Sequence, residues 1–281
     1  MTSSSPGPAS PSVEAPRDLA AWTRWFAGAE IPVLPETAEA LEAFRANEDN
    51  VDANSLGEMI ASDPLMTLKV LAYAATHRSA RVVTDIETVT AALVMMGISP
   101  FFKAFGSQPT VEDRLAGDAE ALLGLTDTLK RAHRGANFAL GFAVHRMDHD
   151  AAVIHAAALL HDFAEMLLWC HAPTLAMRIR VMQRADPALR SSAAQLAALG
   201  IELPDLQQAL MKAWRLPELL IRISDDRHAD SASVKSVTLA VRLARHTAQG
   251  WDNAALPDDV RDIADLLNLS HAATLQLVRE I

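Results

Sequence analysis

A histidine and an aspartate stand side by side at His161-Asp162, in the middle of the apolar run HAAALLHDFAEMLLW. A second histidine, His133, precedes them in another apolar, alanine-rich segment. Imidazole and carboxylate groups together suit divalent ions, and a bound ion can neutralise a phosphoryl group and activate water. The alternative is that the pair, alone or with His133, satisfies its own hydrogen bonds inside a helical core. We favour the core interpretation and keep the metal-binding one open.

The elements around these residues decide whether they can meet. Residues 150 to 169 are apolar on almost every side, which predicts one central helix. Side chains at neighbouring positions on a helix point about 100° apart. His161 and Asp162 can therefore contact one ion only if the ion lies between the directions of the two side chains. A second helix must supply the rest. The segment LTDTLKRAHRGANFALGFAVHRM places small residues beside His133, which makes His133 the natural third partner.

The apolar rhythm of the chain predicts an all-α fold, a multi-helix bundle of about a dozen helices. Runs of β-branched residues are few, and no Asn-Gly or Asp-Gly hairpin signal occurs. Asp63-Pro64 and Ser99-Pro100 each resemble an N-cap followed by proline at the first helical position. Gly97 and Gly200 stand where helices should end.

Composition divides the chain into four parts. Residues 1–17 are rich in Ser, Pro, Ala and Gly, which predicts a disordered tail. We expect an N-terminal helical lobe over 18–106, a helical core over 118–230, and C-terminal helices over 231–281 that pack on the core. The polar segment 107–117 should connect the two lobes. One face of the first helix carries Trp22, Trp25 and Phe26. This face is either a partner-docking surface or, as we favour, a clamp that packs the helix against the rest of the protein.

Charge and cysteine content exclude several classes of protein. The net charge of −10 disfavours binding to nucleic acids or anionic membranes, which requires a basic surface. Local basic patches keep nucleic acid as a third interpretation. The single cysteine, Cys170, cannot form an internal disulfide, and neither an export signal nor an apolar stretch of membrane-spanning length is evident. We therefore expect a cytoplasmic protein that does not enter a membrane.

The pattern of His133, His161-Asp162 and a later aspartate resembles the HD superfamily of metal-dependent phosphohydrolases. Three further segments narrow the resemblance to its HDOD (HD-related output domain) branch: IPVLPETAEAL, LGEMIASDPLMTLKVLAYA and IETVTAALVMMGI. ALLHDFAEMLL and ALMKAWRLPELLIRI also resemble segments of that branch, in the same order. The resemblance runs from about Ile31 to His228, and it implies an HD-like helical core.

The chain departs from the family pattern at positions that matter for catalysis. The glycine and lysine that follow the pair in active relatives are Ala164 and Glu165 here. The closing metal aspartate should lie in a helix resembling SVTLAVRLARH, which holds no acidic residue. Between Asp230 and Asp252 the charged groups are Lys235, Arg242 and Arg245. A cation there would meet positive side chains where it needs a carboxylate. The possible additional ligands are Asp225, Asp226 and His228.

The resemblance and these departures together predict a non-catalytic HDOD-type signal-transduction module of a bacterium. It would bind a signalling partner protein or a small-molecule ligand, with no catalytic residue and no required cofactor, and it could form oligomers. The alternative is a divergent, phosphodiesterase-like phosphohydrolase. That enzyme would hold Mn, Fe, Ni, Zn or Mg through His133, His161 and Asp162.

Overall fold

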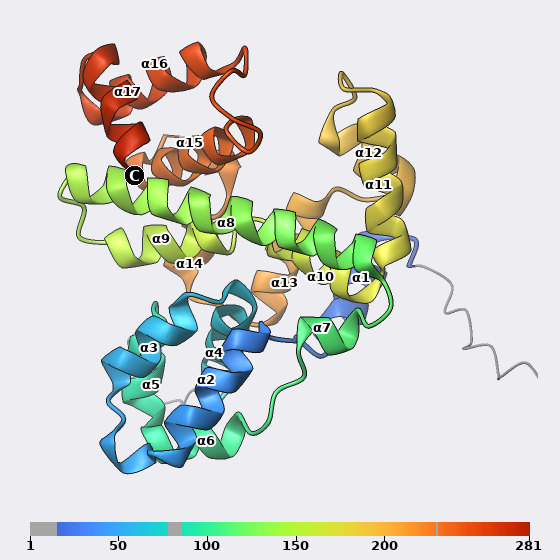
Figure 1. Cartoon of the computed structure of the whole chain (residues 1–281), viewed down its shortest axis with the longest axis vertical. Coiled ribbons are helices and arrows are strands. Elements are labelled where there is room, and N and C mark those ends of the chain that lie inside the picture. Colours follow the sequence, from blue (N-terminus) through green and yellow to red (C-terminus); the bar gives the residue numbers. More distant parts are fainter. Residues whose placement is uncertain (1–15, 78–85, 229) are drawn as a thin grey trace, which may run out of the picture.

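The computed structural model describes residues 16–77, 86–228 and 230–281. Within these ranges the chain is an all-helical bundle, and its one β contact is an isolated parallel bridge between Val33 and Thr110 (Figure 1). The all-α prediction is confirmed. The first 15 residues of the predicted disordered tail lie outside the described residues.

The described residues form 17 α-helices and two short 3-10 helices, more than predicted because turns divide several apolar segments. In chain order the helices are α1 (Leu19–Ala27), α2 (Pro35–Ala46), η1 (Glu48–Asn50), α3 (Ala53–Ala61), α4 (Pro64–Thr76), α5 (Val89–Met96), α6 (Ile98–Ala104), α7 (Val111–Arg114), α8 (Ala119–His145), α9 (Ala151–Leu159), α10 (Phe163–His171), α11 (Pro173–Ala185), α12 (Ser191–Leu199), α13 (Leu203–Ala213), α14 (Glu218–Ile223), η2 (Asp226–His228), α15 (Ala232–His246), α16 (Leu256–Leu267) and α17 (His271–Glu280).

The long helix α8 is the spine of the molecule. It runs across the middle of Figure 1 and packs against α9, α10, α11 and α15. Its inner face carries glycine and alanine, including Gly124, Ala132 and Ala136, which are buried and allow the neighbouring helices to approach closely. His161 and Asp162 lie in the turn between two of these helices, α9 and α10, and α15 carries Arg242 and Arg245.

Helices α2 to α6 pack on one another below α8 in Figure 1. Asp63 is fully buried, caps α4 through the amides of Leu65 and Met66, and also accepts a hydrogen bond of 2.8 Å from the amide of Leu34. One carboxylate thus satisfies donors at the start of α4 and just before α2, because buried amides require partners. The predicted Asp63-Pro64 helix start is confirmed.

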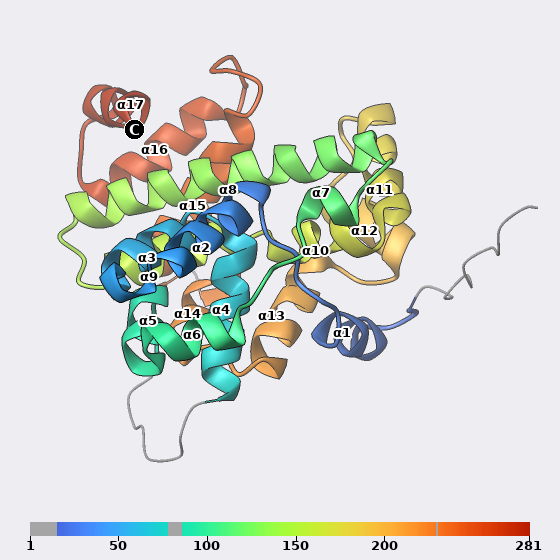
Figure 2. The ribbon, with the colours of Figure 1, turned by 60° about the horizontal axis from the view of Figure 1, so that its bottom comes forward.

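The first helix, α1, lies against α13 on the far side from α2 to α6 (Figure 2). Trp22 and Phe26 are buried, and the indole of Trp22 donates a 3.1 Å hydrogen bond to the carbonyl of Leu199. Buried indole groups need such a partner. In the structure, α1 therefore clamps onto the body, as favoured from the sequence.

Other predicted helix boundaries have mixed outcomes. Gly97 and Gly200 follow the last residues of α5 and α12 with φ angles of 84° and 73°, which favour glycine. Ser99 is not an N-cap, since α6 begins at Ile98. The predicted connection 107–117 contains the short helix α7, which Thr110 caps.

The predicted continuous helix over 150–169 is wrong at its centre. Helix α9 ends at Leu159 and α10 begins at Phe163, with Leu160 and Asp162 outside helical geometry. The amides at this turn bond three residues back, as in Phe163 to Leu160. Because the turn moves His161 and Asp162 off the regular helical path, their side chains can meet despite being adjacent in sequence.

By length and composition, one span of the described residues, Ala151–His171, is apolar enough to cross a membrane. The turn between α9 and α10 lies inside it, and 61% of its most apolar window is buried in the bundle. Burial of this kind is what the central helices of a globular core show. Cys170 is buried in the same region.

Two glycines on α8 give a matched test of this packing. A Cβ atom at Gly124 would lie 2.5 Å from the ring of Trp169, whereas one at Gly135 would lie at 3.5 Å from Val241, an ordinary contact. Gly124→Ala should lower the free energy of unfolding by about 1–3 kcal/mol through overpacking. Gly135→Ala should leave it unchanged or raise it by up to about 1 kcal/mol, because alanine favours helix. Urea unfolding measures both, and equal effects would contradict the packing described.

Candidate functional site

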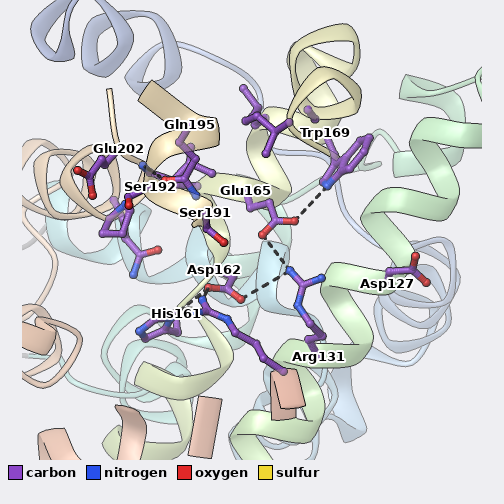
Figure 3. A pocket seen from close by; sticks show the side chains of 18 of the residues that line it. Asp127, Arg131, His161, Asp162, Glu165, Trp169, Ser191, Ser192, Gln195 and Glu202 are labelled. Carbon is purple, nitrogen blue, oxygen red and sulfur yellow. Dashed lines mark hydrogen bonds and ion pairs between the residues drawn. The ribbon is translucent and has the colours of Figure 1, made fainter. Parts of the chain in front are cut away.

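The His161-Asp162 turn opens into a cleft of about 900 Å³. Side chains from α8, α10, α11, α12, α13, η2 and α15 line it. In Figure 3, His161, Asp162, Glu165 and Arg131 lie close together at one end of this cleft. The polar residues that the sequence analysis singled out therefore belong to one solvent-accessible cavity, with some exceptions described below.

His161 is held between two carboxylates. Its Nδ1 lies 3.1 Å from Oδ1 of Asp162, and its Nε2 lies 3.3 Å from Oδ1 of Asp226 in η2. Thr238 of α15 donates a further 2.9 Å hydrogen bond to the same oxygen of Asp226. Carboxylates only accept hydrogen bonds, so both ring nitrogens of His161 must donate. The ring is therefore a cationic imidazolium.

The pKa of His161 reflects this arrangement. Burial opposes the charged ring, but the hydrogen bonds to Asp162 and Asp226 outweigh it and raise the pKa to about 9. For Asp162, burial also disfavours the charge, but Arg245 and His161 hold its pKa well below the ordinary value. The pair therefore carries both charges at neutral pH.

Two arginines complete the surroundings of Asp162. Nη2 of Arg245, on α15, lies 2.7 Å from Oδ1 of Asp162, and Nη2 of Arg131, on α8, lies 3.8 Å from Oδ2. Arg131 also bonds Glu165 at 2.9 Å. Glu165 in turn accepts a 3.0 Å hydrogen bond from Thr128. Three helices thus contribute to one ionic network.

We call this set, which consists of His161, Asp162, Asp226, Arg131, Arg245 and Glu165, the HD network. It contains three cations and three carboxylates, so its charges cancel. Only His161 and Asp162 are deeply placed, at 10% side-chain exposure each, while Asp226 and Arg245 are half exposed at the cleft. Buried charges are stable when they are paired in this way.

The HD network does not fit a metal ion as it stands. Both nitrogens of His161 are hydrogen-bond donors, whereas a metal needs a lone pair on the ring. The guanidinium of Arg245 lies against the carboxylate that would coordinate the ion. Among the described residues, no group of three or more His, Cys, Asp or Glu side chains is arranged to hold a metal.

The structure brings together some of the predicted site residues and separates others. Asp226 joins His161 and Asp162. His133 lies elsewhere: its Nε2 is 2.6 Å from the carbonyl of Ser62, after α3, and its Nδ1 is 2.9 Å from the carbonyl of Leu129. Its two nitrogens face the α3–α4 connection and its own helix, rather than the HD network.

Asp225, which lines the cleft, and His228 pair with their own neighbours rather than with His161 or Asp162. Asp225 pairs with Arg227 at 2.8 Å, and Nδ1 of His228 lies 3.4 Å from the other oxygen of Asp225. These local contacts, rather than a shared ion, account for the acidic and basic residues of this segment. Burial opposes the charge of Asp225, but the hydrogen bonds that Arg227 donates to Asp225 outweigh it and lower the pKa of this carboxyl.

Sequence reasoning missed Arg131 and misjudged Glu165. We considered Glu165 only as the residue that replaces a lysine of active relatives, yet it is the ion-pair partner of Arg131. The signal for Arg131 is weak: together with Asp127 and Arg134 it forms a charged stripe at three- and four-residue spacing on α8, which a solvated helix face would also show. Arg245 was named as a positive charge, but its contact with Asp162 comes from tertiary structure.

Comparisons with known proteins agree with the family resemblance. A family model described as HDOD domain matches residues 31–229, and no curated protein matches the chain. The response regulator MmoQ of Methylococcus capsulatus str. Bath is similar, with a TM-score of 0.65 and 17% identity, over 90% of this chain and 99% of that one. A virulence factor of Campylobacter jejuni subsp. jejuni has a TM-score of 0.64 and 15% identity, over 93% and 97%. At these identities the likeness shows the fold alone.

The raised pKa of His161 predicts a pH-dependent stability. A group whose pKa rises on folding stabilises the folded protein in full at pH values below its unfolded pKa, here 6.5. This stabilisation is lost as the pH rises towards the folded pKa of about 9. The loss for His161 should be about 3 kcal/mol. Between these pH values, the stability difference between wild type and His161→Gln should shrink by this amount in urea unfolding.

An exposed histidine provides the control for this measurement. His149 is exposed and lies outside the HD network, so His149→Gln should keep the wild-type pH dependence. If His161→Gln follows the same pH profile as the wild type, His161 is not an imidazolium held by two carboxylates.

Proposed function

Because the chain belongs to the HDOD family, we propose that it is a non-catalytic regulatory module that binds a signalling partner or a small ligand. The observation that carries this proposal is the contact between Arg245 and Asp162, 2.7 Å long. It places a permanent positive charge where a metal-dependent hydrolase needs a coordinating carboxylate. Arginine is always charged, so Arg245 cannot lose its positive charge by deprotonation to make room for a metal ion.

Charge balance supports the same proposal. Removing Arg245 from Asp162 to admit an ion would leave a guanidinium to be solvated, and displacing Asp226 from His161 would break a second ion pair. Each break is costly because the deeply placed member of the pair, Asp162 or His161, loses a partner. The HD network therefore holds the turn and η2 in place, and the cleft beside it is available for recognition. We expect the protein to carry out this role in the cytoplasm of a bacterium.

The second candidate is a divergent metal-dependent phosphohydrolase. The observation in its favour is that His161, Asp162 and Asp226 converge at one end of a cleft. In such an enzyme these three side chains would be the ligands after Arg245 moved away. The bound ion would supply charge neutralisation and water activation.

Metal content and turnover separate the two candidates. Purified wild-type protein should contain no stoichiometric Mn, Fe, Ni or Zn by elemental analysis. With Mn or Fe added, it should not hydrolyse cyclic dinucleotides or nucleotides. One equivalent of metal with turnover that disappears in His161→Ala would replace our proposal with the second candidate.

A charge reversal tests the role of Arg245 directly. Arg245→Asp removes the guanidinium and introduces a carboxylate beside Asp162 and His161. We expect it to gain measurable Zn or Mn affinity by calorimetry, because the ligand set becomes anionic. Lys235→Asp is the matched control, since it makes the same charge change at an exposed position of the same helix. Equal metal binding by both variants would show that Arg245 does not exclude the ion.

A further inference from the structure

The part of the cleft beyond the HD network lies between two walls, one formed by α8 and the other by α11. Gly124, Asp127, Arg131 and Arg134 line it from one face of α8, and residues of α11 line it from the other side. Arg180 of α11 and Asp127 form a 2.7 Å ion pair that joins these walls. In Figure 1, α11 and α12 rise above α8 at the right, and α15 to α17 lie above it at the left.

Two cations in this region are not neutralised. Lys130 on α8 and Arg184 on α11 are exposed, line the cleft and form no ion pair with any described residue. Arg134 lies 5.5 Å from the ring of Trp251, a contact that leaves its charge uncompensated. The lysine and arginine side chains that line the cleft equal its carboxylates in number, without counting His161. The whole chain has a net charge of −10, so the cleft is less acidic than the protein as a whole, and Lys130 and Arg184 are cations of this cleft without an ion pair among the described residues.

A buried hydroxyl in the same cleft lacks a partner. Ser224 is 5% exposed and lines the cleft, and its Oγ is buried without a hydrogen bond from any described residue. Its backbone carbonyl is already used, since Gln208 donates to it at 3.1 Å. Buried hydroxyls are normally satisfied, so an unsatisfied one in a cavity wall marks a place for an outside partner.

Further groups suit an anion with an organic body. Helix α12 begins at the cleft with Ser191 and Ser192, and its N-cap residue, Arg190, provides no side-chain cap to its amides. Free amides at a helix start attract anions. The apolar part of the wall includes Ala176 and Ile179, which are buried. A volume of about 900 Å³ accommodates a molecule of nucleotide size.

We infer that this cleft binds a small, hydroxyl-bearing organic phosphate, such as a nucleotide or a sugar phosphate. Its phosphate lies between Lys130 and Arg184 near the start of α12, and its hydroxyl-bearing part reaches Ser224. This inference rests on the proposed function, because it names the ligand class of a module that binds without reacting. The HD network forms the end wall of the site and takes no part in chemistry.

Calorimetry on the full chain in EDTA tests the inference with defined probes. These are GMP, ribose 5-phosphate, inorganic phosphate, guanosine and ribose. We expect saturable binding of at least one organic phosphate, weaker binding of inorganic phosphate and no binding of guanosine or ribose. Failure of both organic phosphates to bind, or equal binding of the matching unphosphorylated compound, would overturn the inference.

Amino-acid substitutions test where the phosphate and the hydroxyl-bearing part of the ligand bind. Lys130→Gln with Arg184→Gln should weaken binding by on the order of tenfold or more, because hydrogen bonds to charged groups are lost. Arg178→Gln with Lys212→Gln, both exposed and outside the cleft lining, makes the same charge change and should have little effect. Equal weakening in the two double variants would contradict the phosphate position.

Ser224→Ala tests the deep end of the site. It should weaken binding of the organic phosphate severalfold and leave inorganic phosphate unchanged, since it removes one hydroxyl contact. Unchanged binding of the organic phosphate would overturn the assignment of Ser224. Release of inorganic phosphate from a bound probe after Mn is added would refute the proposed function, whereas absence of binding refutes only this inference.

Discussion

The structure depends on one imidazolium ring held between two carboxylates. His161 reaches Asp162 from the turn between α9 and α10, and Asp226 reaches His161 from η2. Arg245 then fixes Asp162 from α15, and Arg131 links it to Glu165 and α8. The ring therefore connects the middle of the core to the segments that form one end of the cleft. Removing its charge would break the ion pair with Asp226 and leave Asp162 paired with the two arginines alone.

This network explains how an HD pair can persist without a reacting ion. A metal centre and a closed set of ion pairs solve the same electrostatic problem, the stabilisation of a buried carboxylate. Here arginine supplies the positive charge that an ion would bring. Arginine stays protonated and cannot activate water as an ion does. On the proposed function, the network is a wall of a polar cleft that binds a partner or ligand.

The sequence predicted the helical class, the apolar central segment and the excess of positive charge on the helix that became α15. Local signals were sufficient there, because periodicity and the absence of acidic residues are visible in the chain. The turn at Leu160 to Asp162 was not predictable, since no glycine or proline marks it. His133 lies in the predicted helix, but the fold brings the carbonyl of Ser62, directly after α3, to its ring. Which of the three cations of α15 meets Asp162 is likewise a tertiary property.

The most direct measurement of the central claim is the protonation of His161 itself. Nitrogen-15 NMR of histidine-labelled protein at pH 7.5, assigned with His161→Gln, reports both ring nitrogens. We predict two protonated nitrogens whose shifts do not change when one equivalent of Zn²⁺ is added. A deprotonated nitrogen that shifts on stoichiometric Zn²⁺ would show a metal ligand and contradict the account.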